Sequence, residues 1–591
     1  MPNHSERLSA LRSVLAAAGV DGFLVPRSDE HLGEYVPASG ERLAWLTGFT
    51  GSAGMAAVLA DKAAVFTDGR YTTQVQAETD DSLFERRHLT EEPLEAWLRA
   101  HAEGRRIGYD PWLHSEAALK RITGVQLVPM SPNPIDAVWR DRPAPPAAAV
   151  VAHPLEYAGV TAETKREAAA AELRKSGEDA VVLADAHSVA WLLNIRGADL
   201  ANTPLALAFA LLRADGSVRM FLHAPDRVSA ETRSILGNRV AVEPRAHLPA
   251  ALGELSGRKV RIDPDLTPEW FAATLREAGA IVVAGEDPCR LPRAMKNPVE
   301  QQGARDAHAR DAVAVARFLA WFAAEAPKGG QSEMSAANQL LAFRREVKGF
   351  TAESFPAISG AAENGAIVHY RVTEATDRPI AADECYLIDS GGQFPDGTTD
   401  ITRTLWSGPG AAPAGLCARY TAVLRGHIAL GTLRFPEGVA GPHLDAIARR
   451  PLWEAGLDYD HGTGHGVGSF LSVHEGPVAF SRAAKVVPIR PGMILSDEPG
   501  YYLPGQYGIR IENLLLARLA EPQPDQVRPF LEFETLTLAP YARALIEPAL
   551  LTPAEIRWID AYQARVLEEV GPHLDEATRA WMEAECAPLE A

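Results

Sequence analysis

The sequence predicts a multidomain protein of the α/β and α+β classes, in which two related α/β domains precede a larger, strand-rich domain. Three observations predict this architecture. A helix–strand pattern recurs with similar sequence, a Pro- and Ala-rich stretch separates the two copies, and the order of helices and strands changes after Pro292. The chain has 591 residues, of which 47% are hydrophobic, so it can form several hydrophobic cores.

The first predicted domain, residues 1–150, alternates helices and strands. Apolar spacing predicts a helix over residues 8–18 and a strand over residues 22–26. VFTDGRY at residues 65–71 continues the alternation before further helix. This order of elements is typical of an α/β domain.

The second predicted domain, residues 151–292, repeats the first. RLAWLTGFTG at residues 42–51 resembles SVAWLLNIRG at residues 188–197, and RRIGYDP and RKVRIDP follow them in the same order. RDRPAPPAAAVVAHP at residues 140–154 has no apolar period, so it is the predicted linker.

The third predicted domain, residues 293–530, begins with helices. A long amphipathic helix is predicted over residues 299–327, and Ser332 can cap the helix that follows. Strands separated by turn residues dominate from Phe355 onward. This change of pattern marks a domain of a different kind.

Two helical features are predicted towards the C-terminal side. One helix is expected around residues 444–453, and Pro451 should kink or end it. Residues 531–591 are predicted as an extension that packs on the third domain, because Trp558 and Tyr562 recur at helical spacing.

The composition excludes several classes of protein. The 58 basic and 77 acidic residues give a formal net charge of −19 without a dense Lys/Arg run, so no binding to nucleic acid or to a membrane is expected. Four scattered cysteines are too few for a disulfide framework. Because the N-terminal stretch reads as an amphipathic helix rather than a signal peptide, we expect a cytoplasmic protein.

Two acidic hairpins are predicted in the third domain. In IDSGGQFPDGTTDITRT, a turn at residues 395–397 can bring Asp389 and Asp400 to one face. In ILSDEPGYYLPGQYGIRIEN, Glu498 and Glu512 flank another turn. Solvated turn acids or surface ion pairs would have similar sequences. Neither hairpin alone therefore establishes a metal site.

HGTGHGVGSF at residues 461–470 supplies a nitrogen ligand. His465 with four carboxylates could hold two divalent ions of the Mn, Co or Zn kind, and such a site suits hydrolysis. The glycines are interpreted as room for a substrate backbone. A turn histidine is the alternative, whereas a phosphate loop lacks its GxxxxGK[ST] motif here. HEGP at His474 is not HExxH, and no GxSxG motif occurs, so metal-assisted hydrolysis remains.

The order of these acids and His465, with their flanking text, resembles the metallopeptidases of family M24, which have the "pita-bread" fold. The resemblance is closest to the long, three-domain cytosolic form of Xaa-Pro aminopeptidase (aminopeptidase P). It extends over nearly the whole chain, including TGFTGSAG, NGAIVHY, FLSVHEGP and EFETLTLAPY. It implies two creatinase N-terminal-like domains before a pita-bread catalytic domain. The metal ligands that it implies are Asp389, Asp400, His465, Glu498 and Glu512.

The resemblance also implies an activity, which is removal of the N-terminal residue from peptides with proline in the second position. A hydroxide that bridges two metal ions, usually Mn²⁺ but possible also with Co²⁺ or Zn²⁺, would attack the Xaa-Pro bond. Glu498 would be both a ligand and the general base. His369 would shuttle a proton, His474 would contact the substrate carbonyl, and His461 would line the proline pocket.

Other site residues and the partners are implied in the same way. Arg510 and Tyr502 would hydrogen-bond the acidic ligands beside the substrate. Arg42 would reach the far end of the peptide. The resemblance further implies a cytoplasmic homodimer that acts on proline-containing peptides.

Three other functions have sequences of similar pattern. A prolidase, which is restricted to Xaa-Pro dipeptides, is the main alternative, although the length and the two N-terminal domains favour an aminopeptidase. Creatinase-type hydrolases lack the acidic ligands that are present here. A non-catalytic binding module of the same fold is disfavoured because the ligands are intact and no long acidic tail follows.

Overall fold

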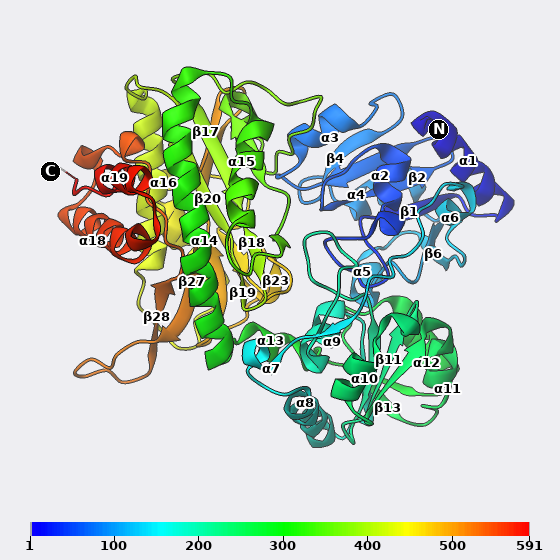
Figure 1. Ribbon diagram of the computed structural model, residues 1–591. Helices are drawn as coiled ribbons and strands as arrows, with labels where there is room; N and C mark the ends of the chain where they lie inside the picture. Colours follow the sequence, from blue (N-terminus) through cyan, green and yellow to red (C-terminus); the bar gives the residue numbers. More distant parts are fainter. Residues whose placement is uncertain (1–2, 590–591) are drawn as a thin grey trace. The chain divides into compact units, whose positions relative to one another are not determined.

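The computed structural model describes residues 3–589 and divides into two compact units (Figure 1). The first unit contains the chain up to Leu155 and then Val160–Arg290. The second unit contains Glu156–Gly159 and the chain from Leu291 onward. Within the described residues, no helix is both long and apolar enough to cross a membrane.

Two six-stranded sheets of the same topology form the first unit, in the orders β4-β3-β2-β1-β5-β6 and β12-β11-β10-β8-β13-β14. In each sheet one central strand, β1 or β8, pairs antiparallel on one side and parallel on the other. The first sheet consists of β1 Gly22–Pro26, β2 Gly54–Leu59, β3 Ala63–Thr67, β4 Glu85–His88, β5 Arg106–Tyr109 and β6 Gln126–Pro129. The second consists of β8 Ala180–Leu183, β10 Phe209–Arg213, β11 Val218–Leu222, β12 Val240–Pro244, β13 Lys259–Ile262 and β14 Ile281–Ala284. The matching topologies confirm the predicted repeat.

The repeated sequence text occupies equivalent elements in the two halves of the first unit. RLAWLT forms helix α2 (Arg42–Thr47), and AHSVAWLL forms helix α9 (Ala186–Leu193). The first predicted helix and strand are also confirmed, as α1 (His4–Ala17) and β1. Leu11 and Leu15 of α1 pack with Phe23 of β1 in one buried core, because they lie on one face of the helix.

Long helices lie alongside the strands of the second unit (Figure 1), among them α14 (Pro298–Glu325), α15 (Glu333–Arg345) and α16 (Ala414–Gly431). As predicted, α14 is long and Ser332 caps α15. Helix α16 was not predicted, because buried residues occupy most of its circumference and leave no amphipathic period. Helix α17 (Gly441–Glu454) continues past Pro451, so proline does not end this helix, and the predicted alternative of a kink stays a prediction. Only one turn follows Pro451, so few backbone hydrogen bonds are affected.

Antiparallel strands bring the two predicted hairpins into the second unit. One sheet has the order β16-β17-β20 and another has the order β21-β28-β27-β24-β22-β23. The strands of the first are β16 Ile358–Ala361, β17 Cys385–Ser390 and β20 Ile401–Trp406. Those of the second are β21 Phe435–Pro436, β22 Gly464–Gly466, β23 Glu475–Phe480, β24 Ile494–Asp497, β27 Asn513–Leu519 and β28 Phe530–Thr535. Two tight hairpins, β18 (Gly392–Phe394) with β19 (Gly397–Thr398) and β25 (Gly500–Leu503) with β26 (Tyr507–Arg510), contain the predicted turns.

The C-terminal segment forms helices α18 (Pro553–Val570) and α19 (Glu576–Glu585), as predicted. Ile559, Tyr562 and Val566 of α18 share a buried core with Tyr420 and Leu424 of α16. This segment is therefore packed into the second unit.

Candidate metal centre

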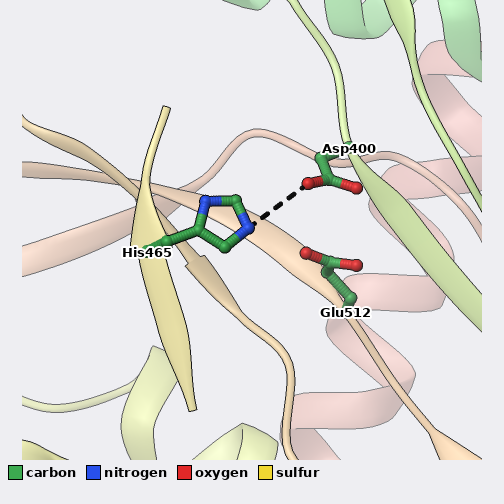
Figure 2. A group of neighbouring side chains, drawn as sticks. All are labelled: Asp400, His465 and Glu512. Atoms are coloured by element: carbon green, nitrogen blue, oxygen red, sulfur yellow. Dashed lines mark ion pairs between the residues drawn. The ribbon is translucent and has the colours of Figure 1, made fainter. Parts of the chain in front are cut away.

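Five predicted ligands come from separate strands or strand ends of the second unit. Asp389 lies in β17, Asp400 precedes β20, His465 lies in β22, and Glu498 and Glu512 flank β25 and β26. One ligand atom each from Asp400, His465 and Glu512 lies within 4.8 Å of the others (Figure 2). His465 Nε2 is 3.5 Å from Asp400 Oδ2 and 3.8 Å from Glu498 Oε1. The imidazole of His465 therefore faces a group of carboxylates.

The first hairpin places Asp389 and Asp400 near each other. Asp389 pairs with Thr402 across β17 and β20, two residues beyond Asp400, so the intervening turn resets the register. Thr402 Oγ1 donates to Glu512 Oε2 at 2.7 Å and accepts a hydrogen bond from Arg510 Nε at 3.2 Å. The sequence reasoning missed Thr402, although its spacing of two from Asp400 could have indicated a shared strand face.

The second hairpin brings its two acids together at its base. Asp497 pairs with Asn513 across β24 and β27, and their chain neighbours are Glu498 and Glu512. The backbone N–H of Glu498 donates to the carbonyl of Thr463 at 2.7 Å. The loop that precedes His465 is thereby connected to the segment between β24 and β25 that carries Glu498.

A chain of hydrogen bonds connects Asp389 with His461. Arg510 Nη2 donates to Asp389 Oδ2 at 2.7 Å, and Nη1 donates to Tyr502 Oη, also at 2.7 Å. Tyr502 Oη is 2.9 Å from His461 Nε2, and His461 Nδ1 is 2.7 Å from the carbonyl of Gly462. Since a carbonyl can only accept, Nδ1 carries the proton and Tyr502 donates to Nε2. Arg510 and Tyr502 therefore orient His461, which has no direct part in the contact of this hydrogen-bond chain with the carboxylate of Asp389.

The other two predicted histidines lie in different surroundings. The rings of His474 and His465 meet edge to face with centroids 4.2 Å apart. His369 is partly exposed and adjoins Tyr370, whose hydroxyl donates to Glu333 Oε2 at 2.9 Å. His474 therefore borders the metal centre, and the roles of both histidines stay predictions.

Arg42 belongs to the first unit and is only 2% exposed. Its Nε donates to Asp136 Oδ1 at 2.8 Å, and its Nη2 lies 3.5 Å from Glu30 Oε1. These acids already bind the guanidinium, and contact with a peptide stays a prediction.

The glycines beside His465 have a structural reason of their own. A Cβ on Gly464 would lie 1.9 Å from the carbonyl oxygen of Ser496, and one on Gly466 would lie 2.2 Å from that of Glu475. The close approach of neighbouring strands accounts for both glycines, and the interpretation as room for a substrate backbone stays a prediction.

Unpaired buried oxygens indicate that the cluster is built for a cation. Within residues 3–589, Asp389 Oδ1, Asp400 Oδ1 and Glu512 Oε1 are buried and accept no hydrogen bond. His465 Nδ1 is 3.0 Å from the carbonyl of Gly466, so Nδ1 carries the proton and Nε2 presents a lone pair to the acids. These three oxygens, to which no group of the described chain donates, and the imidazole lone pair fit divalent metal ions.

The electrostatics of the cluster support the same conclusion. Burial, followed by repulsion from Asp389 and Glu498, raises the pKa of Asp400 well above its usual value. Burial and repulsion from Asp400 and Glu498 raise the pKa of Glu512 in the same way. Such acids resist ionisation together unless positive charge lies among them.

Comparisons with known proteins agree with this site. Residues 302–518 match metallopeptidase family M24, and residues 529–589 match its C-terminal region. Residues 7–138 and 141–300 each match the creatinase/prolidase N-terminal domain. A probable Xaa-Pro aminopeptidase P of Neosartorya fischeri is 38% identical over 99% of this chain and 93% of its own. The chain belongs to family M24.

Two further relatives of this M24 peptidase extend the likeness over the full length. Aminopeptidase P1 of Arabidopsis thaliana is 35% identical and covers 99% of each chain. The crystal structure of X-prolyl aminopeptidase from Caenorhabditis elegans, described as a cytosolic enzyme with a di-nuclear active site, has a TM-score of 0.94. It is 31% identical and covers 100% of each chain. The chain is thus a metallopeptidase with two creatinase-type domains before its catalytic domain.

Metal binding to this M24 peptidase is expected to stabilise it more as the pH rises. Because the folded-state pKa values of Asp400 and Glu512 are raised, the metal-free protein loses stability as pH rises from about 4 through those values. Metal ions need both carboxylates ionised, so they compete with protons and bind more tightly at higher pH. The increase in melting temperature caused by excess Mn²⁺ should be larger at about pH 7.5 than at about pH 5.5. Equal increases would contradict the prediction.

Proposed function

We propose that this chain is a dinuclear, metal-dependent Xaa-Pro aminopeptidase, which removes the N-terminal residue from peptides with proline in the second position. The observation that carries the proposal is the convergence of Asp400, His465 and Glu512. It occurs in a chain whose full-length relatives are named Xaa-Pro aminopeptidase P. A prolidase is less favoured, because the relatives named Xaa-Pro aminopeptidase P match the chain over all three domains.

The proposed ligands are the acids of the two hairpins and one histidine, namely Asp389, Asp400, His465, Glu498 and Glu512. When bound, two metal ions supply an activated water nucleophile and polarise the carbonyl of the scissile bond. Arg510 holds Asp389 and Thr402 holds Glu512, so the acids are oriented before any ion binds.

Glu498 is suited to act as the general base as well as a ligand. Its side chain is 18% exposed, whereas that of Asp400 is only 4% exposed, so Glu498 can meet both water and substrate. It takes a proton from the attacking water, and the proline nitrogen must gain one as the bond breaks. His369 delivers that proton in this proposal, and His474 donates a hydrogen bond to the developing oxyanion.

His461 and Tyr502 explain a preference for proline. The Xaa-Pro bond is a tertiary amide without an N–H, so a site that offers no acceptor there loses nothing. His461 uses Nδ1 and Nε2 within the protein, so it presents mainly ring surface to the substrate. That surface suits the compact pyrrolidine ring.

The substrate class is tested by comparing Xaa-Pro-Xaa tripeptides with Xaa-Pro dipeptides, after removing metal and restoring Mn²⁺, Co²⁺ or Zn²⁺ one at a time. We expect kcat/KM for the tripeptide to exceed that for the dipeptide by at least about 10-fold, with Mn²⁺ the most effective ion. Activity on dipeptides alone would indicate a prolidase. Metal binding without hydrolysis of either peptide would indicate a binding module.

Three remaining proposals concern the whole protein. The described cytosolic location of the Caenorhabditis elegans enzyme supports a cytoplasmic location here. A homodimer is proposed from the family resemblance alone. The division at residues 150, 292 and 530 is proposed for the domains, and it is supported by the ranges of the family matches.

A further inference from the structure

A buried ion pair on α17 lies directly behind the loop that carries His461. Asp445 and Arg449 are one helical turn apart and are 0% and 1% exposed. Arg449 Nε donates to Asp445 Oδ2 at 2.8 Å. The pairing compensates the buried charge of Arg449 and leaves its two terminal nitrogens for other acceptors.

Those two nitrogens bind the loop at residues 458–463. Arg449 Nη1 donates to Asp458 Oδ1 at 2.8 Å and to the carbonyl of Tyr459 at 2.6 Å, and Nη2 donates to the carbonyl of His461 at 2.6 Å. The guanidinium also lies 3.9 Å from the centre of the Tyr459 ring. An irregular loop cannot satisfy its own buried carbonyls, so its path depends on these donors.

We propose that Arg449 is a positioning residue for substrate recognition, which fixes the His461 loop and thereby one wall of the proline pocket. This inference rests on the proposed Xaa-Pro activity. The imidazole of His461 donates to Gly462 within the same loop, so the path of the loop backbone sets the place of the ring. Lysine could keep the charge beside Asp445, but it lacks the planar fork that reaches several acceptors at once.

The test is the Arg449→Lys variant of the full-length, metal-loaded protein. KM for an Xaa-Pro-Xaa peptide should rise by about 10-fold or more, while kcat stays within about 3-fold and the bound metal content is unchanged. Arg450→Lys is the matched control, because Arg450 is the next residue of α17 and its side chain is 76% exposed and paired with Glu454. The control should leave both constants unchanged.

A double variant separates positioning from a merely structural role. If Arg449 acts through His461, Arg449→Lys should raise KM little further when His461→Ala has already removed the pocket wall. Should Arg449→Lys fail to fold, Asp458→Ala removes one anchor of the loop at a side chain that is 35% exposed. It should raise KM by about 3-fold with kcat retained.

The outcomes distinguish this inference from the proposed function. A wild-type protein that leaves Xaa-Pro-Xaa uncut counts against the function itself. A wild-type protein that cuts this peptide, with a KM that Arg449→Lys does not change, overturns the positioning role. A variant whose kcat alone falls, or whose effect on KM adds fully to that of His461→Ala, overturns it as well.

Discussion

Replacing Asp400 with asparagine is expected to reduce hydrolysis of Xaa-Pro-Xaa by more than about 100-fold, the upper end of the loss caused by removing a partner of a metal ligand. Asp400 is one of the three residues that meet within 4.8 Å, and its oxygen Oδ1 is buried without a donor. An amide there keeps the shape but loses the negative charge that holds a divalent ion. Bound metal, measured by elemental analysis, should fall together with activity.

The same substitution is expected to stabilise the metal-free protein. Repulsion from Asp389 and Glu498 is among the causes that raise the pKa of Asp400, and a neutral side chain removes that repulsion. The melting temperature without metal should therefore rise, which distinguishes loss of a ligand from misfolding. Asp396→Asn is the control, because Asp396 lies in the same hairpin but pairs with Arg310. If Asp400→Asn retained full metal content and activity, the proposed ligand set would be wrong.

The sequence predicts the two acidic hairpins well because their information is local, whereas the meeting of Asp400, His465 and Glu512 depends on three separate segments of the chain. PDG and PG turns define two hairpins, and a hairpin brings its own acids together whatever the rest of the chain does. The predicted turns lie between β18 and β19 and between β25 and β26. Strand order also repeats between the two halves of the first unit, as the repeated text suggested.

Features that depend on distant contacts were not predictable in this way. Helix α16 is buried on most sides, so its sequence lacks the polar stripe that marks a surface helix. Arg449 has no distinctive sequence context, and the partners of Thr402 and Arg449 are known only once the strands and loops have packed. The reason for Gly464 is equally non-local, because it is set by the backbone of the strand beside it.

Arg403→Met is expected to destabilise the second unit by at least about 3 kcal/mol, since three buried acceptors would lose their donor at about 1–3 kcal/mol each. Arg403 is 1% exposed and stacks 4.9 Å from the centre of the Tyr541 ring. Its hydrogen-bond acceptors are the carbonyls of Thr402, Glu512, Ala539 and Pro540, the amide oxygen of Asn513 and the hydroxyl of Tyr562. Removing the buried charge returns part of its desolvation cost, but the carbonyls of Glu512 and Pro540 and the amide oxygen of Asn513 lose a donor, and these losses outweigh that gain.

The position of Arg403 connects this loss of stability to the metal centre. Its acceptors include the carbonyl of Glu512, a proposed ligand, and Tyr562 of the C-terminal helix α18. Urea unfolding of the second unit should therefore shift to lower concentration, and metal affinity should fall with it. Arg518→Met is the matched control, because Arg518 lies on β27 with a side chain that is 55% exposed, and its loss should cost less than about 1 kcal/mol. If Arg403→Met unfolded at the same urea concentration as the control, the C-terminal segment would not be held through this arginine.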